Sequence, residues 1–172
     1  MTQKTLTCFK AYDIRGEINV DIDEDVAYRI GRAVSQHFEA GSVVVGFDAR
    51  ETSPSFADAV SRGICDAGSD ALTIGQAGTE EMYWAVTEFG ACAGIEVTAS
   101  HNPINYNGMK IVKSGSQPLD DLNDFQVIKA LAESADWLVA SRSGHVIDKS
   151  VEARTKYVDQ VLSFVDVDVL RP

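Results

Sequence analysis

Hydrophobic positions along the chain follow two spacings, one typical of helices and one typical of buried strands. Val26, Ile30 and Val34 recur every four residues after an acidic run at residues 21–25, which predicts an amphipathic helix with acids in its first turn. Residues 43–47 form a short continuous apolar run, which favours a buried strand. The first part of the chain is therefore predicted to form a helix followed by a strand.

The same alternation continues through most of the chain. Ser53-Pro54 predicts a helix with Ser53 as its N-cap and proline in the first turn, ending near Gly68. Thr79 is expected to cap the next helix, which ends at Gly90. Further strands are expected at residues 71–75, 93–98, 109–112 and 145–147, and a further helix at residues 122–132.

This order of elements indicates the fold class. Strands that alternate with helices of ten or more residues predict a three-layer α/β/α domain with a mixed, mostly parallel sheet. Ligands of such sheets bind at loops that follow the carboxyl ends of strands. The candidate loops are therefore residues 48–50, 76–79 and 99–108.

The last segment departs from the alternation. It carries an apolar helical face made of Tyr157, Val161, Leu162 and Val165. We therefore expect residues 1–150 to form one domain, and residues 151–172 to be a linker helix that leads to a second domain absent from this chain.

Composition and charge narrow the possible functions. The 172 residues are 45% hydrophobic and 24% charged, which suits one globular domain. We expect a cytoplasmic protein, because no apolar run approaches the roughly 18 residues of a membrane span and the N-terminus lacks an apolar leader. The net charge of −11 disfavours nucleic acid and anionic membranes as partners, and a bound phosphate would need a local group of positive charges.

The cysteines carry no sign of a disulfide framework or a metal site. Cys8, Cys65 and Cys92 are odd in number and widely spaced. They are expected to be reduced thiols, as in cytoplasmic proteins.

Residues 98–110 form the segment with the clearest chemistry. Its Asn, Pro and Gly residues mark irregular backbone between two predicted strands, and loops of this kind often direct backbone N–H groups at anions. Ser100 is well placed there to meet a ligand. A hydrolase nucleophile elbow would need glycine where Thr98 and Asn102 stand. His101 directly follows Ser100, and neighbouring side chains of an extended chain diverge, so by local geometry alone it is a poor general base for Ser100. From the residues alone, a surface turn without function remains possible.

Three stretches resemble one family. The run TASHNPINYNGMKIV at residues 98–112 closely resembles the phosphoserine loop of the α-D-phosphohexomutases. Residues 9–16, FKAYDIRG, look like the opening signature of that family. Residues 75–83, which contain Gly-Thr-Glu-Glu at 78–81, are similar to the enterobacterial-type phosphomannomutase branch. The chain is identified on these motifs as the N-terminal domain of a family member.

The resemblance implies an activity and a set of residues. The activity is the interconversion of hexose 6-phosphate and hexose 1-phosphate through a phosphoserine and a bisphosphorylated sugar. By this resemblance Ser100 is the phosphoserine, and His101 and Asn102 line the same loop. Lys110 is the general acid/base, while Arg15, with Tyr12 nearby, holds phosphate.

Phosphoryl transfer needs in-line positioning and neutralised charge, which agrees with these roles. Arg15 offers a planar fork of donors that suits phosphate. Lys10, Arg50 and Lys113 could join Lys110 in a positive cluster, although each of the three also fits a solvated surface charge.

The resemblance also implies Mg²⁺, bound partly by the phosphate on Ser100 and mainly by an aspartate-rich loop of a missing domain. The acidic pairs Asp120-Asp121 and Asp166-Val167-Asp168 lack the glycine and arginine of that loop, so we expect them to cap helices or to be solvated. The chain alone should therefore fold without turning over.

The expected partners are a hexose phosphate, a sugar bisphosphate activator and the remaining enzyme domains in cis, with a dimer of this chain possible. Residues 78–81 favour mannose. Phosphoglucomutase activity, and a non-catalytic phosphosugar-binding or phosphoserine-regulated module, remain the alternatives.

Overall fold

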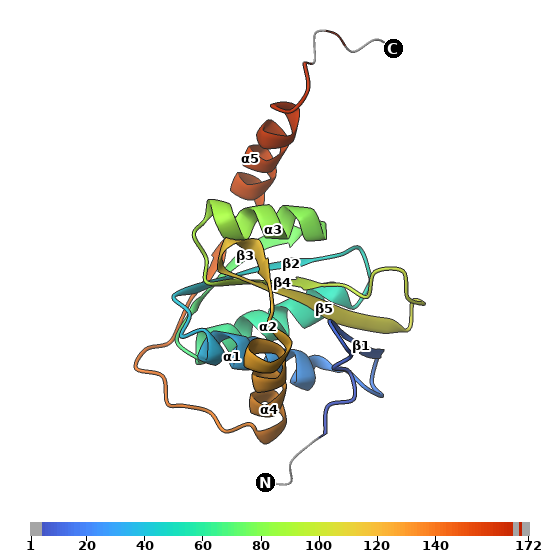
Figure 1. The fold of residues 1–172 in the computed structure, drawn as a ribbon, viewed down its shortest axis with the longest axis vertical. Coiled ribbons are helices and arrows are strands. Elements are labelled where there is room, and N and C mark those ends of the chain that lie inside the picture. Colours follow the sequence, from blue (N-terminus) through green and yellow to red (C-terminus); the bar gives the residue numbers. More distant parts are fainter. Residues whose placement is uncertain (1–4, 167–168, 170–172) are drawn as a thin grey trace.

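A mixed sheet forms the centre of the molecule. The structure is a computed structural model that describes residues 5–166 and residue 169. Within these residues, seven strands form one sheet in the order β1-β5-β4-β2-β3-β7, with β6 paired to β5 (Figure 1). The strands are β1 (Ile14–Glu17), β2 (Ser42–Phe47), β3 (Asp70–Gln76), β4 (Ala93–Val97), β5 (Tyr106–Lys113), β6 (Gln117–Pro118) and β7 (Val146–Asp148).

Strand β5 runs in the opposite direction to the other strands of the sheet. The neighbours β4, β2, β3 and β7 run parallel. On the other side, β5 is antiparallel to β4, to β1 and to β6. The direction changes where the chain folds back from β4 into β5, and Ser100 lies in that connection.

Helices cover both faces, which confirms the three-layer α/β/α architecture (Figure 1). One face carries α1 (Glu24–His37), α2 (Ser53–Asp66) and α4 (Gln126–Ser134), and the other carries α3 (Thr79–Glu88) and α5 (Ser150–Leu162). Val26, Ile30 and Val34 are fully buried on α1, as their spacing predicts. Burial of such apolar faces against the sheet is the main favourable term in folding.

The start of α2 differs from the prediction by one residue. Thr52, rather than Ser53, is the N-cap, and Pro54 lies in the first turn as expected. The Ser53 hydroxyl instead donates to Asp48 Oδ1 at 2.6 Å, because the helix begins directly after the loop that holds Asp48. Helix α3 likewise has Gly78, in an extended conformation, as its N-cap in place of Thr79.

The segment after β4 holds most of the unpredicted structure. Strand β5 begins at Tyr106, three residues before the predicted strand. The predicted helix at 122–132 is divided into a π-helix, Asp121–Phe125, and α4.

Strands β1 and β6 were not predicted, because each is short and exists only through pairing with β5.

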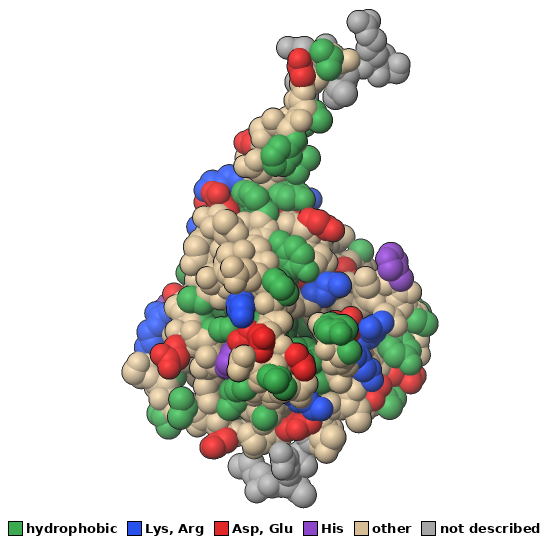
Figure 2. Space-filling view, in the orientation of Figure 1, with side chains coloured by type: hydrophobic (Ala, Val, Ile, Leu, Met, Phe, Trp, Pro, Cys, Tyr) green, Lys and Arg blue, Asp and Glu red, His purple; other side chains and the backbone are tan. Residues whose placement is uncertain are grey.

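Helix α5 projects from the body of the domain (Figure 1). Its first half packs on α3, where the Tyr157 ring lies 5.6 Å from the Trp84 ring. Val161, Leu162 and Val165 are about half exposed, at 45%, 48% and 49%. Hydrophobic side chains are accordingly visible along α5 in the space-filling view (Figure 2). None of the helices in the described residues is both long and apolar enough to span a bilayer.

Candidate active site

The Ser100 loop joins the central strand β4 to β5. At its base, the Thr98 N–H donates to the Gly108 carbonyl at 2.9 Å, which continues the strand pairing. Ser100 is exposed and has a positive φ of 55°. Its own N–H donates to Thr98 Oγ1 at 2.9 Å. A non-glycine residue in this backbone region is uncommon and is enriched at functional sites.

The neighbours of Ser100 differ in what their side chains contact. The His101 side chain is exposed beside Ser100. Asn102 folds back on the loop, because its backbone N–H and its side-chain Nδ2 both donate to the Ala99 carbonyl, at 3.1 and 2.7 Å. The Asn102 amide therefore stabilises the turn that presents Ser100.

Arg50 belongs to the loop between β2 and α2, and its side chain reaches into the Ser100 loop. Its side chain is only 11% exposed, and Nε lies 3.3 Å from Asp48 Oδ2. The other guanidinium nitrogens donate to backbone carbonyls: Nη1 to Pro103 (2.8 Å) and Tyr106 (3.1 Å), and Nη2 to Ser100 (3.0 Å) and Asn102 (2.7 Å). The interpretation of Arg50 as a solvated loop charge is therefore wrong.

A second set of polar contacts supports the same loop. Asn107 is fully buried, and its Nδ2 donates to Thr52 Oγ1 at 2.9 Å and to Ser53 Oγ at 3.1 Å. Its Oδ1 accepts from the Gly108 N–H at 2.8 Å. Residues 48–53 thus hold the Ser100 loop through both Arg50 and Asn107.

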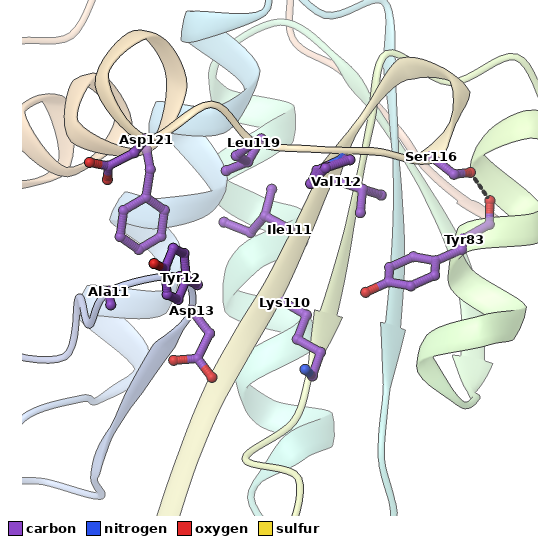
Figure 3. Close-up of a pocket in the computed structure, with 12 residues that line it drawn as sticks. Ala11, Tyr12, Asp13, Tyr83, Lys110, Ile111, Val112, Ser116, Leu119 and Asp121 are labelled. Carbon is purple, nitrogen blue, oxygen red and sulfur yellow. Dashed lines mark hydrogen bonds between the residues drawn. The ribbon is translucent and has the colours of Figure 1, made fainter.

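A cavity of about 280 Å³ lies beside β5, and Lys110 extends into it (Figure 3). Tyr12 and Asp13 lie on one side of Lys110, and Tyr83 of α3 lies on the other. The cavity is lined by Ala11, Tyr12, Asp13, Tyr83, Lys110, Ile111, Val112, Ser116, Pro118, Leu119, Asp121 and Phe125. The fold therefore brings together Tyr12 and Lys110, which the sequence placed in two separate motifs.

Arg15 is placed next to this cavity by strand pairing. It lies on β1 opposite Gly108 of β5, and its Nη2 contacts Asp13 Oδ1 at 3.1 Å. The Arg15 side chain is 40% exposed and Tyr12 is 93% exposed, so both are accessible to a ligand.

The expected positive cluster is smaller than the sequence suggested. Lys113 pairs with Asp124 at 2.7 Å, and Lys10 Nζ donates to the Thr7 carbonyl at 2.8 Å. Both Nη groups of Arg50 already donate to backbone carbonyls, and its Nε pairs with Asp48. In the part of the chain that the structure describes, no carboxylate forms an ion pair with Lys110. Lys110 and the partly exposed Arg15 are therefore the cations best placed to meet a phosphate. On the face shown in Figure 2, acidic and basic side chains are otherwise interspersed.

The sequence reasoning missed Glu96, a buried carboxyl on β4. Glu96 is 1% exposed, and neither carboxyl oxygen has a hydrogen-bond partner among the described residues. Burial, reinforced by the charges of Asp48, Glu81 and Glu80, raises its pKa to about 9. A single glutamate inside the apolar run of β4 was the available signal, and it lies opposite Lys110 in the β4–β5 register.

The acidic pairs behave largely as expected. Asp120 caps the π-helix by accepting from the Asn123 N–H, and Asp121 accepts from Gln126. Asp166 is described, while Val167 and Asp168 lie outside the described residues. Within the described residues, no group of three or more His, Cys, Asp or Glu side chains could hold a metal ion.

Fold and loop together define an α/β/α domain that presents one serine at the carboxyl end of a central strand, while the following strand contributes a lysine to a cavity. The family model described as phosphoglucomutase/phosphomannomutase, alpha/beta/alpha domain I, matches residues 6–137. The chain belongs to this family.

Individual relatives agree with that assignment. The chain is 46% identical to a phosphomannomutase of Escherichia coli over 97% of its own length, which is 36% of that relative. It is 47% identical to a phosphomannomutase of Klebsiella pneumoniae over 92% of its length and 100% of the relative. A solved phosphoglucomutase/phosphomannomutase family protein from Burkholderia thailandensis superposes with a TM-score of 0.78 at 32% identity, covering 92% of this chain and 36% of that one. The chain thus spans about a third of the length of most of the relatives it matches.

Proposed function

We propose that this chain is the phosphoserine-bearing domain of a longer phosphohexomutase that interconverts hexose 6-phosphate and hexose 1-phosphate. Mannose is the preferred sugar. The observation that carries the proposal is Ser100 itself, exposed in a left-handed conformation on a loop that contacts with residues 50–53 hold, where β4 turns back into the strand that carries Lys110. The phosphomannomutase names of the relatives support the choice of substrate.

The chemistry consists of two phosphoryl transfers, the first from Ser100 to the sugar and the second from the sugar back to Ser100. In the first half, a sugar hydroxyl oxygen bonds to phosphorus and loses its proton, while the bond between phosphorus and Ser100 Oγ breaks and Oγ gains a proton. The bisphosphorylated sugar then turns round, and Ser100 Oγ loses its proton and takes the other phosphoryl group, while the departing sugar oxygen gains a proton. Lys110 moves the proton of the sugar hydroxyl, and His101 is a further catalytic residue of the loop. Tyr12, Arg15 and Asn102 hold and orient phosphate.

The rest of the enzyme supplies what these residues lack. The phosphate on Ser100 offers one ligand to Mg²⁺, and the remaining ligands come from another domain, with the ion neutralising charge during transfer. Residues 151–172 connect domain I, residues 1–150, to that domain. The exposed Val161, Leu162 and Val165 pack against that domain or against a second copy of this chain. The protein works in the cytoplasm, where its three cysteines stay free.

Glucose is the second candidate substrate, because the matching family description names both activities. The deciding experiment uses the full-length protein and a coupled assay with each hexose phosphate, Mg²⁺ and a sugar bisphosphate activator. Ser100→Ala should lower turnover by several orders of magnitude, since the proposal uses no other nucleophile. Ser134→Ala, on the exposed side of α4, is the matched control and should be normal.

Near-normal turnover of Ser100→Ala would contradict the assignment. A wild-type protein that binds both hexose phosphates but converts neither would instead support a non-catalytic phosphosugar-binding module.

A further inference from the structure

We propose that Arg50 is a positioning residue for phosphoryl transfer, which sets the conformation of the Ser100 loop without touching the phosphate. This inference rests on the proposed role of Ser100. It concerns a residue from a different loop, 50 positions earlier in the chain.

The first argument is the number of donors and acceptors. A guanidinium has five N–H donors in a fixed plane and accepts nothing. Four hydrogen bonds run from Nη1 and Nη2 to backbone carbonyls of the loop, and Nε forms an ion pair with the carboxylate of Asp48 at 3.3 Å. Because the loop engages both Nη groups, Arg50 acts through the backbone that it holds rather than through the substrate.

The second argument concerns the direction of the peptide groups. No peptide bond in the described chain is cis, and in a trans peptide the N–H points opposite to the carbonyl. Because the carbonyls of Ser100 and Pro103 point at Arg50, the N–H groups of His101 and Ile104 point away from it. Neither N–H has a hydrogen-bond acceptor among the described residues. The outward N–H of His101, directly after Ser100, suits a phosphate on Ser100 Oγ.

The third argument is backbone strain. Ser100 holds a left-handed φ that most residues avoid. Arg50 binds the carbonyls of Ser100 and Asn102 from one side, so relaxation of Ser100 would break these bonds. Asp48 in turn orients the guanidinium, and its Oδ1 accepts from both the Arg50 N–H and the Ser53 hydroxyl. The loop is therefore held in shape before any substrate arrives.

Lysine cannot replace arginine in this arrangement, because an ammonium is a point charge with fewer donors and no planar fork. In the full-length protein, Arg50→Lys should lower kcat for hexose phosphate conversion about 100-fold, the usual effect of a misplacement near 1 Å. KM should change less than about threefold, because no substrate contact is lost. The rate at which a sugar bisphosphate phosphorylates Ser100 should fall in parallel with kcat. Arg62→Lys, at an exposed position of α2, is the matched control and should retain wild-type kcat.

Hydrogen exchange of the same full-length variants separates positioning from general stability. In Arg50→Lys, the amides of Ser100, Asn102 and Tyr106, which are hydrogen-bonded within the loop, should exchange at least about tenfold faster. The amides of α1 should be unchanged. Unchanged loop exchange with kcat within threefold of wild type would overturn the proposal, and so would faster exchange spread equally over loop and α1. If Ser100→Ala keeps its turnover, the proposed function fails, whereas the exchange result still reports whether Arg50 holds the loop.

Discussion

Gly46 on β2 leaves open the space that the carboxyl group of Glu96 occupies. The two residues are aligned in the β2–β4 register, and a Cβ at position 46 would collide with Oε2 of Glu96. The carboxyl is thus enclosed between the sheet and the layer of α3, where no described group donates to it. A buried polar group without a hydrogen-bond partner costs about 1–3 kcal/mol of folding free energy. Because the Glu96 carboxyl can release a proton, its burial also makes the stability of the protein depend on pH.

The first prediction concerns Glu96→Gln. The ordinary glutamate pKa is 4.5, and burial raises that of Glu96 to about 9 in the folded protein. Between these two values the unfolded chain releases the proton while the folded protein keeps it, so the unfolded state binds fewer protons and stability falls as pH rises. This slope approaches about 1.4 kcal/mol per pH unit for one group.

Glutamine has no such proton, so the variant should lose less stability than wild type between pH 5 and pH 8.5. Urea unfolding at several pH values measures the difference. The exposed Glu51→Gln should follow the wild-type curve. Parallel curves for wild type and Glu96→Gln would show that Glu96 is ionised in the folded protein.

The second prediction concerns Asp124, which joins three elements. It contacts His37 of α1 at 3.0 Å and Lys113 of β5 at 2.7 Å from the end of the π-helix. Burial acts to raise the pKa of Asp124, but hydrogen bonds from His37, Lys113 and the Asp120 N–H outweigh it and lower the pKa to about 2. The stability that the ionised Asp124 adds to the folded protein is therefore fully present above pH 3.8 and is lost as pH falls towards 2.

Asp124→Asn should lower the free energy of unfolding by about 1–3 kcal/mol at pH 7, because Lys113 loses its buried partner. Below pH 3.8 the difference from wild type should shrink, because the unfolded wild-type chain takes up a proton on Asp124 while the folded carboxyl, with a pKa of about 2, stays ionised. Thermal unfolding across this range is the measurement, with the exposed Asp58→Asn as control. A difference that stays constant down to pH 2 would mean that the ion pair contributes little.

The third prediction concerns Lys110 in the full-length protein. Its side chain enters the cavity between Tyr12 and Tyr83, where a sugar hydroxyl could reach it (Figure 3). Lys110→Met should lower turnover by about two to four orders of magnitude, because the proton then has no carrier. Phosphorylation of Ser100 by a sugar bisphosphate should remain partly possible.

Steady-state kinetics and mass spectrometry of Ser100 test this. Lys129→Met, on α4 away from the cavity, should behave as wild type. A variant in which only KM changes would make Lys110 a phosphate clamp rather than the acid/base.

The spacing of apolar residues close together in the sequence predicted most of the fold. The four-residue repeat of Val26, Ile30 and Val34 and the apolar run of β2 predicted their elements, because each depends on which side chains leave water. The Ser100 loop was recognisable because its residues are adjacent in sequence. Helix ends were less predictable, as Thr52 and Gly78 show, because a cap depends on where the preceding loop arrives.

By itself, the sequence determined the layer order, the family motifs and the serine that we propose as the phosphoryl carrier. Only the tertiary structure decided what Arg50 does, because its acceptors are backbone carbonyls 50 to 56 positions away, and carbonyls have no residue-specific signature. The same holds for Glu96, whose burial comes from a glycine on one neighbouring strand and from a helix packed above it. Contacts between distant segments set the environment of a polar group, and no local pattern records that environment.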